Sequence, residues 1–220
     1  MLQEIHRICA GINCYLIRGR EGFALIDTGP AMARRRLLRG LERTGCGEED
    51  LRLIVLTHGD VDHIGSAVQL REMFGAQIAA HQIEARALES AGRQSNRKEK
   101  PDLTPWFFKA LMPLGRLFGG VDPLALDLIL EDEQSLSPFG IDATVLHLPG
   151  HSGGSIGVLT EDGDLFCGDL FWNMRRPRLH PLIDDLEDAR ASIQKLRGLP
   201  IKTIHPAHGK PFPATQMASV

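Results

Sequence analysis

The sequence predicts an α/β fold, a four-layer αββα sandwich in which two mixed β-sheets pack face to face with helices outside. Two observations lead to this prediction. Short β-rich runs alternate with amphipathic helical runs along the chain, and both halves follow the same order of strands, then a helix, then a strand. A chain of 220 residues can bury a sizeable core, so we expect a single domain over residues 1–220.

The first half is expected to start with strands joined by a hairpin-like turn. Strands are predicted at residues 12–17, 23–26, 53–56 and 77–80. Helices are predicted at about 31–44 and 64–74. The apolar stripe of the first helix would consist of Met32, Leu37, Leu38 and Leu41. Gly45, Cys46 and Gly47 would end it.

The second half returns to strands after a segment of different character. Strands are predicted at 128–130, 143–148, 155–160, 165–167 and 203–205, with a helix at about 186–196. Residues 82–123 are interpreted as a helical lid insertion, because a polar run at 92–101 precedes the most aromatic patch, at 106–114. For that patch a packed helix, a lid over the active site, and a membrane-touching or homodimer-forming surface all stay open.

Composition and termini restrict the class of protein. A net charge of -3 gives no basic surplus, so no nucleic-acid partner is expected. The four cysteines form no C-x-x-C pair and are interpreted as buried free thiols in a reducing compartment. The N-terminus lacks the pattern of a signal peptide, and no apolar stretch approaches the roughly 20 residues that span a bilayer. We therefore expect a cytoplasmic protein without a membrane partner.

The run Thr-His-Gly-Asp-Val-Asp-His at 57–63 is the most informative feature of the chain. It places His58, Asp60, Asp62 and His63 within six consecutive residues, directly after an apolar strand. Groups of this kind packed so closely repel or desolvate one another unless a cation holds them together. A strand that ends in such a loop is typical of a rigidly presented metal site.

Three further strand ends supply ligand-type side chains. His151 lies in the run P-G-H-S, Asp169 follows the strand at 165–167, and the run H-P-A-H-G contains His205 and His208. A single histidine after a strand is more often a capping or surface residue. Several such sites together with the run at 57–63 indicate one shared metal centre.

The order of these motifs resembles that of the metallo-β-lactamase superfamily of αββα hydrolases. The motifs are T-H-x-x-x-D-H, P-G-H-S, G-D and P-A-H-G, and the similarity extends from L-I-D-T-G at 25–29 to Gly209. The resemblance implies two metal sites that share one bridging carboxylate. The ligands would be His58, Asp60 and His151 at the first site, Asp62, His63 and His208 at the second, and Asp169 as the bridge. Asp27 would orient the ligand loop without binding a metal, and a simple turn role is compatible with that.

Residue 60 departs from the family pattern H-x-H-x-D-H, because it is Asp where the second imidazole is usual. A third carboxylate adds negative charge, so the bridging water should be less polarised and its pKa higher. Two divalent ions are expected, zinc by the family resemblance, with iron or manganese favoured by Asp60. The diiron flavoprotein branch of the superfamily carries Glu at this position. A mononuclear site made of Asp62, His63, Asp169 and His208 remains an alternative.

The implied function is metal-dependent hydrolysis, with a metal-bound hydroxide attacking a small ester, thioester, lactone or phosphoester. Asp62 would be the catalytic residue that takes or shuttles a proton. The alternative is a diiron redox or oxygen-handling protein, or a non-catalytic metal-binding protein, on the same fold. Metal content and an assay of esterase activity separate these classes.

The segment after Asp169 would line the site that binds the substrate. Arg175, Arg176 and Arg178 can bind an anionic small molecule, since guanidinium matches carboxylate or phosphate, although a solvated basic loop explains them as well. His180 is either a proton shuttle or a surface histidine. His205 is the rival of His208 as a ligand, and the H-G ending favours His208.

Several branches of the family are expected not to fit. Glyoxalase-II-like enzymes carry a further C-terminal helical domain, and this sequence ends soon after Gly209. Lactone hydrolases use a tyrosine near the metals, whereas Tyr15 is far from the motifs in sequence. No flavodoxin-like segment follows. The sequence thus predicts a generic metallo-hydrolase.

Overall fold

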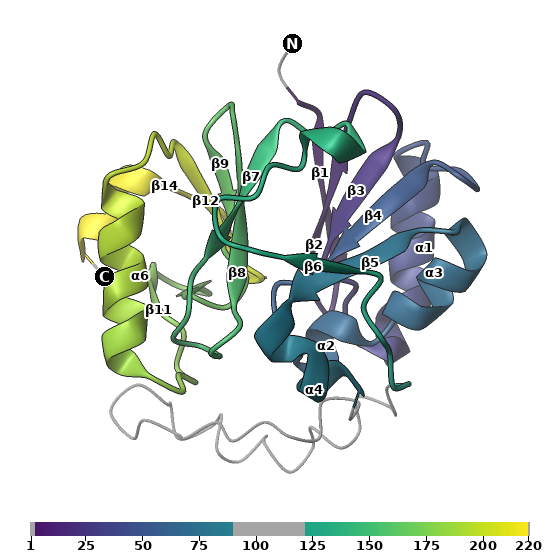
Figure 1. The fold of residues 1–220 in the computed structure, drawn as a ribbon. Helices are drawn as coiled ribbons and strands as arrows, with labels where there is room; N and C mark the ends of the chain where they lie inside the picture. The colour runs from purple at the N-terminus through teal and green to yellow at the C-terminus, as the bar shows by residue number, and fades with distance from the viewer. Residues whose placement is uncertain (1–2, 90–121, 220) are drawn as a thin grey trace.

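The computed structural model describes residues 3–89 and 122–219. Two mixed sheets face each other, and helices cover the outer side of each (Figure 1). The first sheet has six strands in the order β1-β2-β3-β4-β5-β6, and the second has five in the order β14-β12-β9-β8-β7. A small third sheet has the order β11-β10-β13. The predicted αββα sandwich is confirmed.

The first sheet begins antiparallel and becomes parallel from β3 onward. Its strands are β1 (Ile5–Ala10), β2 (Ile12–Arg18), β3 (Phe23–Ile26), β4 (Leu51–Val55), β5 (Gln77–His81) and β6 (Leu128–Leu130). Its helical segments are η1 (Ala31–Ala33), α1 (Arg34–Arg43), α2 (Val61–Ile64), α3 (Ala67–Phe74), η2 (Gln82–Glu84) and α4 (Ala85–Glu89). Because β3, β4 and β5 are parallel, the loops that follow them leave the same edge of the sheet.

The second sheet pairs β9 with β12 in parallel, and its other neighbours are antiparallel. Its strands are β7 (Ala143–His147), β8 (Ile156–Thr160), β9 (Asp164–Phe166), β12 (Thr203–His205) and β14 (Phe212–Pro213). The third sheet consists of β10 (Phe171–Asn173), β11 (Arg178–Leu179) and β13 (His208–Gly209). The remaining helical segments are η4 (Ser137–Phe139), α6 (Leu186–Arg197) and η5 (Ala214–Ser219).

Three apolar cores separate the four layers. The core between the two sheets includes Ile26, Val55, Val158 and Phe166. The core between the first sheet and its helices includes Leu25, Leu37, Leu41 and Leu70. The core between the second sheet and α6 includes Leu165, Ile193, Leu196 and Ile204. Each fully buried side chain of this size contributes about 1.5–3 kcal/mol, and this burial holds the strand ends that carry the polar loops.

The helix predicted at 64–74 is wrong in its first part, because two helices stand there. Asp62 and His63 lie on α2, and α3 starts only at Ala67. Gly65 is the physical reason, since a Cβ at this position would lie 2.3 Å from the backbone nitrogen of Ala31. The chain must therefore pack tightly here before the second helix begins, a contact that local periodicity does not reveal.

Other corrections are smaller. Met32 is 69% exposed and is not part of an apolar stripe, because η1 shifts the register before α1 starts. Cys9 is exposed, although the other three cysteines are buried as expected.

The strand β1 and the short strands β10, β11, β13 and β14 were not predicted. Most of the segment 82–123, including the aromatic patch at 106–114, lies outside the described residues. Within the described ranges, no helix has the length and hydropathy to cross a membrane.

Candidate metal centre

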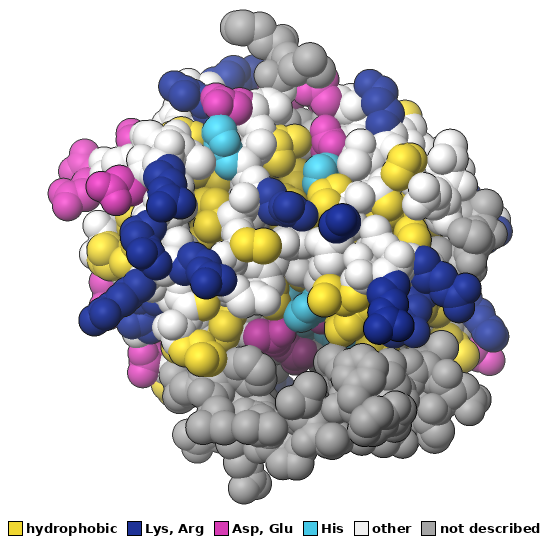
Figure 2. Space-filling view, turned by 180° about the vertical axis from the view of Figure 1, so that it is seen from behind, with side chains coloured by type: hydrophobic (Ala, Val, Ile, Leu, Met, Phe, Trp, Pro, Cys, Tyr) yellow, Lys and Arg dark blue, Asp and Glu magenta, His cyan; other side chains and the backbone are white. Residues whose placement is uncertain are grey.

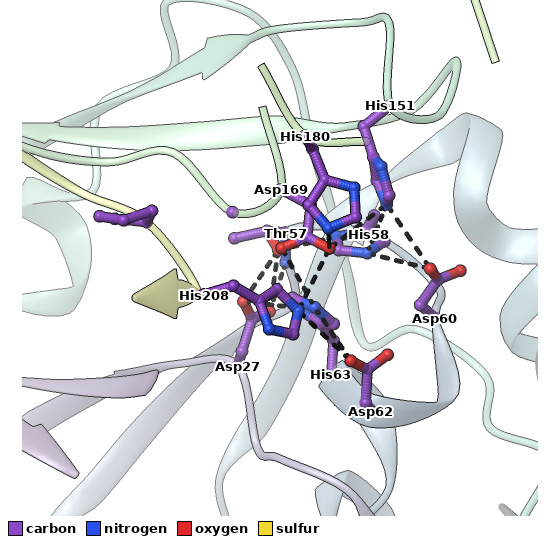
Figure 3. A network of polar contacts seen from close by, with 12 residues as sticks. Asp27, Thr57, His58, Asp60, Asp62, His63, His151, Asp169, His180 and His208 are labelled. Atoms are coloured by element: carbon purple, nitrogen blue, oxygen red, sulfur yellow. Dashed lines mark hydrogen bonds and ion pairs between the residues drawn. The ribbon is translucent and has the colours of Figure 1, made fainter. Parts of the chain in front are cut away.

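The predicted ligand residues meet where the loops of both sheets converge (Figure 3). The loop after β4 carries His58 and Asp60, and α2 carries Asp62 and His63. The second sheet contributes His151 from the loop between β7 and β8 and Asp169 from the loop after β9, and β13 contributes His208. Residues more than 90 positions apart in sequence, such as His58 and His151, thus face one another.

The first group is built around two imidazoles and two carboxylates. The Nε2 atoms of His58 and His151 are 3.1 Å apart. Asp60 Oδ2 is 3.5 Å from each of these two nitrogens. Asp169 Oδ2 is 3.6 Å from His151 Nε2. His58, His151 and Asp169 together offer ligand atoms within 4.8 Å of one another, which is the spacing of donors around one ion.

The second group shares Asp169 with the first. His208 Nε2 is 3.5 Å from Asp62 Oδ2 and 3.5 Å from Asp169 Oδ2. His63 Nε2 is 3.6 Å from Asp169 Oδ1 and 3.9 Å from Asp62 Oδ2. Asp169 therefore directs one oxygen toward His63 and the other toward His151 and His208, so it lies between the two groups.

Asp27 lies behind the cluster and binds the loop that carries it. Its carboxylate accepts the backbone N–H of Thr57 at 2.8 Å and the Thr57 hydroxyl at 2.9 Å. It also lies 2.9 Å from His63 Nδ1. Asp27 is 2% exposed and has a φ of +59°, a left-handed conformation that Asp tolerates better than most residues.

The hydrogen bonds of three imidazoles assign their tautomers. His63 Nδ1 faces Asp27, His151 Nδ1 faces the carbonyl oxygen of Leu182 at 2.7 Å, and both partners can only accept. His58 Nδ1 faces the Thr57 hydroxyl at 3.0 Å, whose own proton is directed to Asp27. Each Nδ1 therefore donates, and each Nε2 directs a lone pair into the cluster.

This arrangement fits a divalent cation. Among the described residues, the buried atoms His63 Nε2 and Asp169 Oδ1 have no hydrogen-bond partner, although they face the same space. Imidazole lone pairs mixed with carboxylate oxygens are the donors that zinc and iron prefer. An orphaned buried acceptor costs about 1–3 kcal/mol unless a donor or an ion satisfies it.

The electrostatic field of the site is negative. Burial lowers the pKa of His208, but the carboxylates of Asp169 and Asp62 raise it to about 10. Burial likewise opposes protonation of His63, yet Asp27, Asp169 and Asp62 raise its pKa well above the usual value. A site that attracts protons this strongly also attracts metal cations, which compete for the same atoms.

His180 was expected at the surface or as a shuttle, and the surface alternative is wrong. It is 2% exposed, and its Nε2 is 3.4 Å from Asp169 Oδ2. The backbone N–H of Leu182 donates to its Nδ1 at 3.2 Å, and the N–H of His180 itself donates to the Leu170 carbonyl at 3.2 Å. These backbone contacts turn the ring inward, and a single histidine in a loop gives no sequence signal for them.

Two further residues of the site were missed by the sequence analysis. Trp172 stacks on His208 with ring centroids 5.3 Å apart and an interplanar angle of 24°. Glu84 is buried and accepts hydrogen bonds from the loops of His58 and His151. Neither stands in a motif, although a lone acidic residue at the start of a helix is a weak signal that its carboxylate is used.

The remaining candidates are three arginines, His205 and Tyr15. Arg175 and Arg176 are exposed in the loop after β10, and Arg178 is half-buried. On the face shown in Figure 2, Lys and Arg side chains form several separate groups. His205 turns away from the cluster, with its Nε2 2.7 Å from Asp164 Oδ1. Tyr15 is near the motif H-P-A-H-G in space, because its hydroxyl donates to the Pro206 carbonyl at 2.8 Å.

Comparisons with known proteins agree with this geometry. A sequence model of the metallo-beta-lactamase superfamily matches residues 7–208. The hydroxyacylglutathione hydrolase GloC of Haemophilus influenzae is 31% identical over 165 residues, which are 73% of this chain and 66% of that protein. The human acyl-coenzyme A thioesterase MBLAC2 is 30% identical over 178 residues, 73% of this chain and 58% of that protein.

Solved structures give the same fold. TTHA1623, solved in a di-iron-bound form, is 26% identical with a TM-score of 0.71, and the match covers 99% of this chain and 97% of that one. Over the curated relatives named above, the chain spans slightly less than two thirds of the first and somewhat more than half of the second.

Proposed function

The chain belongs to the metallo-beta-lactamase superfamily, and on that premise we propose that it is a metal-dependent hydrolase with a dinuclear centre. The observation that carries this proposal is the position of Asp169 between two groups of imidazole nitrogens and carboxylate oxygens. One residue that serves two such groups is the arrangement by which a protein holds two ions close together.

We propose the following residues as ligands. The first ion would be held by His58, Asp60 and His151, the second by Asp62, His63 and His208, and Asp169 would contact both. Asp27 would orient His63 and the loop of Thr57 through its hydrogen bonds. Bound there, divalent ions supply an activated water molecule and polarise the oxygen of an acyl or phosphoryl group.

The side chains of the site would handle protons and orientation. Asp62 is the partly exposed carboxylate of the second group, with a side chain 27% exposed, so it can accept a proton from the attacking water and return it to solvent or product. His180 Nδ1 lies 3.2 Å from both the backbone nitrogen and the carbonyl oxygen of Leu182, so either tautomer fits, and its Nε2 lies 3.4 Å from Asp169 Oδ2. With the proton on Nε2 it would orient the Asp169 carboxylate, and with the proton on Nδ1 it would offer a lone pair beside Asp169 and His208, with which it forms a third group of ligand atoms.

The identity of the ions is a finer part of the proposal. Zinc is the ion implied by the family, while the carboxylate of Asp60 favours iron or manganese over an imidazole-rich site. The di-iron-bound form of TTHA1623, which matches nearly the whole chain, supports iron as a candidate here.

Thioesters are the substrate class to test first. Both curated relatives described above have names that denote thioester hydrolysis, one on a glutathione thioester and the other on acyl-coenzyme A. This weighs against the sequence-based expectation that glyoxalase-II-like chemistry does not fit. Arg175 and Arg176 are exposed in the loop after β10, the strand that pairs with His208, and we propose them as the residues that would bind an anionic group of such a substrate.

The test combines elemental analysis of the freshly purified protein with a panel of glutathione and coenzyme A thioesters, nitrophenyl esters, a lactone and a phosphodiester. We expect about two metal equivalents per chain, thioester hydrolysis that a chelator abolishes, and loss of both metal and activity in His63→Ala and Asp169→Ala. A protein that binds no divalent metal would overturn the proposal. Tightly held iron with a visible absorption band and no hydrolysis would instead support a redox protein.

A further inference from the structure

A single buried carboxylate connects the two loops that form the first metal group. Glu84 Oε2 accepts the backbone N–H of Gly59 at 2.8 Å. Its Oε1 accepts the Ser152 hydroxyl at 2.6 Å and the backbone N–H of Gly154 at 3.0 Å. Gly59 lies between His58 and Asp60, whereas Ser152 and Gly154 follow His151. Glu84 itself comes from a third segment, η2.

The burial of Glu84 is specific to this residue. It is 5% exposed, whereas its neighbours Gln82 and Ile83 on η2 are less buried. A carboxylate is buried only where donors replace the water it loses, and here three donors from the two loops do so. The side chain therefore points inward to bind the loops and is not a surface charge.

We propose that Glu84 is a positioning residue that sets the separation of the two loops and thereby the affinity of the first metal site. This inference rests on the proposed dinuclear centre and adds a residue that contacts no ion. The distance of 3.1 Å between His58 Nε2 and His151 Nε2 joins the same two loops that Glu84 binds. Removing the carboxylate removes three hydrogen bonds that join the two loops, so the ligand side chains of the first site are held less firmly at their mutual distance.

The second site is supported by different contacts. His63 is oriented by Asp27, and its carbonyl accepts the N–H and hydroxyl of Thr28. The loop before His208 is bound by Asn13 and Tyr15 through the Pro206 carbonyl. Because none of these contacts involves Glu84, loss of its carboxylate is expected to weaken the first site selectively.

Gly154 offers a second way to test the same contact. A Cβ at Gly154 would lie 2.6 Å from Glu84 Oε1 and 2.8 Å from Glu84 Cγ, so Gly154→Ala displaces the carboxylate while leaving Glu84 in the sequence. The adjacent Gly153 is a matched control. A Cβ there meets Ile83 Cγ2 at 3.6 Å, an ordinary contact, so Gly153→Ala changes the same loop without reaching Glu84.

The experiment titrates metal-free protein with Zn²⁺ in competition with a chromophoric chelator, for the wild type, Glu84→Ala, Glu84→Gln, Gly154→Ala and Gly153→Ala. We expect two binding steps in the wild type and in Gly153→Ala. In Glu84→Ala and Gly154→Ala we expect one step to be retained and the other weakened by at least about tenfold. Glu84→Gln should lie between them, because its amide oxygen can accept from one loop but its NH₂ faces donors of the other.

Each outcome of the titration supports or contradicts the proposed role of Glu84. Two unchanged steps in Glu84→Ala and Gly154→Ala would overturn the role of Glu84 while leaving the dinuclear centre intact, and so would equal weakening of both steps. A wild type that binds no Zn²⁺ would instead overturn the proposed function. If thermal denaturation shows that Glu84→Ala is not folded, the comparison of Gly154→Ala with Gly153→Ala decides alone, because both keep the buried carboxylate in the chain.

Discussion

His58 Nε2 and His151 Nε2 lie 3.1 Å apart, although the two residues are separated by 93 positions in sequence. Each ring donates its Nδ1 proton to a partner outside the cluster, so both nitrogens direct lone pairs at one another. Two acceptors at this distance repel unless a cation lies between or beside them. The relationship joins a loop of the first sheet to a loop of the second, so the proposed metal site depends on the packing of the two sheets against each other.

His208 and His205 allow a matched comparison of two histidine substitutions. His208 faces Asp62 and Asp169, whereas His205 is bound to Asp164 away from the cluster. We expect His208→Ala to lose about one metal equivalent and most hydrolytic activity, because the second group loses one of its imidazoles. His205→Ala should keep the metal content of the wild type. Elemental analysis of both variants checks this, and equal metal loss in the two would contradict the assignment of His208.

Replacing Asp60 by His would give the H-x-H-x-D-H pattern that the sequence analysis expects for the family. Imidazole favours zinc, and a carboxylate favours harder ions such as iron and manganese. The Asp60 side chain is 22% exposed, so we expect Asp60→His to leave the fold intact and to shift metal preference toward zinc. Loading the metal-free protein with equimolar Zn²⁺ and Mn²⁺, followed by elemental analysis, measures the preference. If the ratio does not change, residue 60 does not contact an ion.

The residues of the cluster could be recognised as candidates from the sequence because they stand at strand ends, whereas their proposed division into two metal sites comes from the family resemblance. His58, His151 and Asp169 follow apolar runs that local pattern identifies as strands, and a layered α/β fold brings such ends together. Local sequence patterns do not indicate how a side chain is oriented when distant backbone groups hold it. His180 turns inward through the backbone of Leu170 and Leu182.

Glu84 and Gly65 show that local sequence patterns do not predict tertiary packing contacts either. The carboxylate of Glu84 is buried because donors 25 and 70 positions away meet it, and nothing within η2 reveals those donors. Gly65 lies between α2 and α3, where a Cβ would collide with the backbone of residues 30 and 31. Both features depend on tertiary contacts, and at Gly65 these contacts override the helical periodicity of residues 64–74.

The ion pair of Asp132 and Lys195 predicts a pH dependence of stability that does not involve the proposed metal ligands. Burial raises the pKa of Asp132, but hydrogen bonds from Lys195 and from the backbone of His147, with the Lys195 charge, lower it below the usual 3.8. Since the folded pKa lies below the unfolded one, the carboxylate stabilises the protein above about pH 4. This stabilisation is lost as the pH falls through the folded pKa.

The measurement is the free energy of unfolding of wild type and Asp132→Asn between about pH 3 and pH 7, a range that extends to both sides of the unfolded pKa of about 3.9. The carboxylate is 44% exposed, so we expect the wild type to be more stable by at most about 1 kcal/mol near neutral pH. The difference should shrink below about pH 4. Lys195→Met should give the same profile, and a difference independent of pH would contradict the role of the ion pair.

Tyr15 and Asn13 predict a coupled effect on stability. Both donate to the Pro206 carbonyl, at 2.8 Å and 3.0 Å, in the loop before His208. In Tyr15→Phe the acceptor keeps its bond from Asn13, so we expect a loss of about 1 kcal/mol in urea denaturation. Asn13→Ala leaves Tyr15 as the remaining donor to that carbonyl. The double variant removes both donors and should cost about 1 kcal/mol more than the sum of the single variants. Strict additivity would show that the two side chains do not share the carbonyl as their common acceptor.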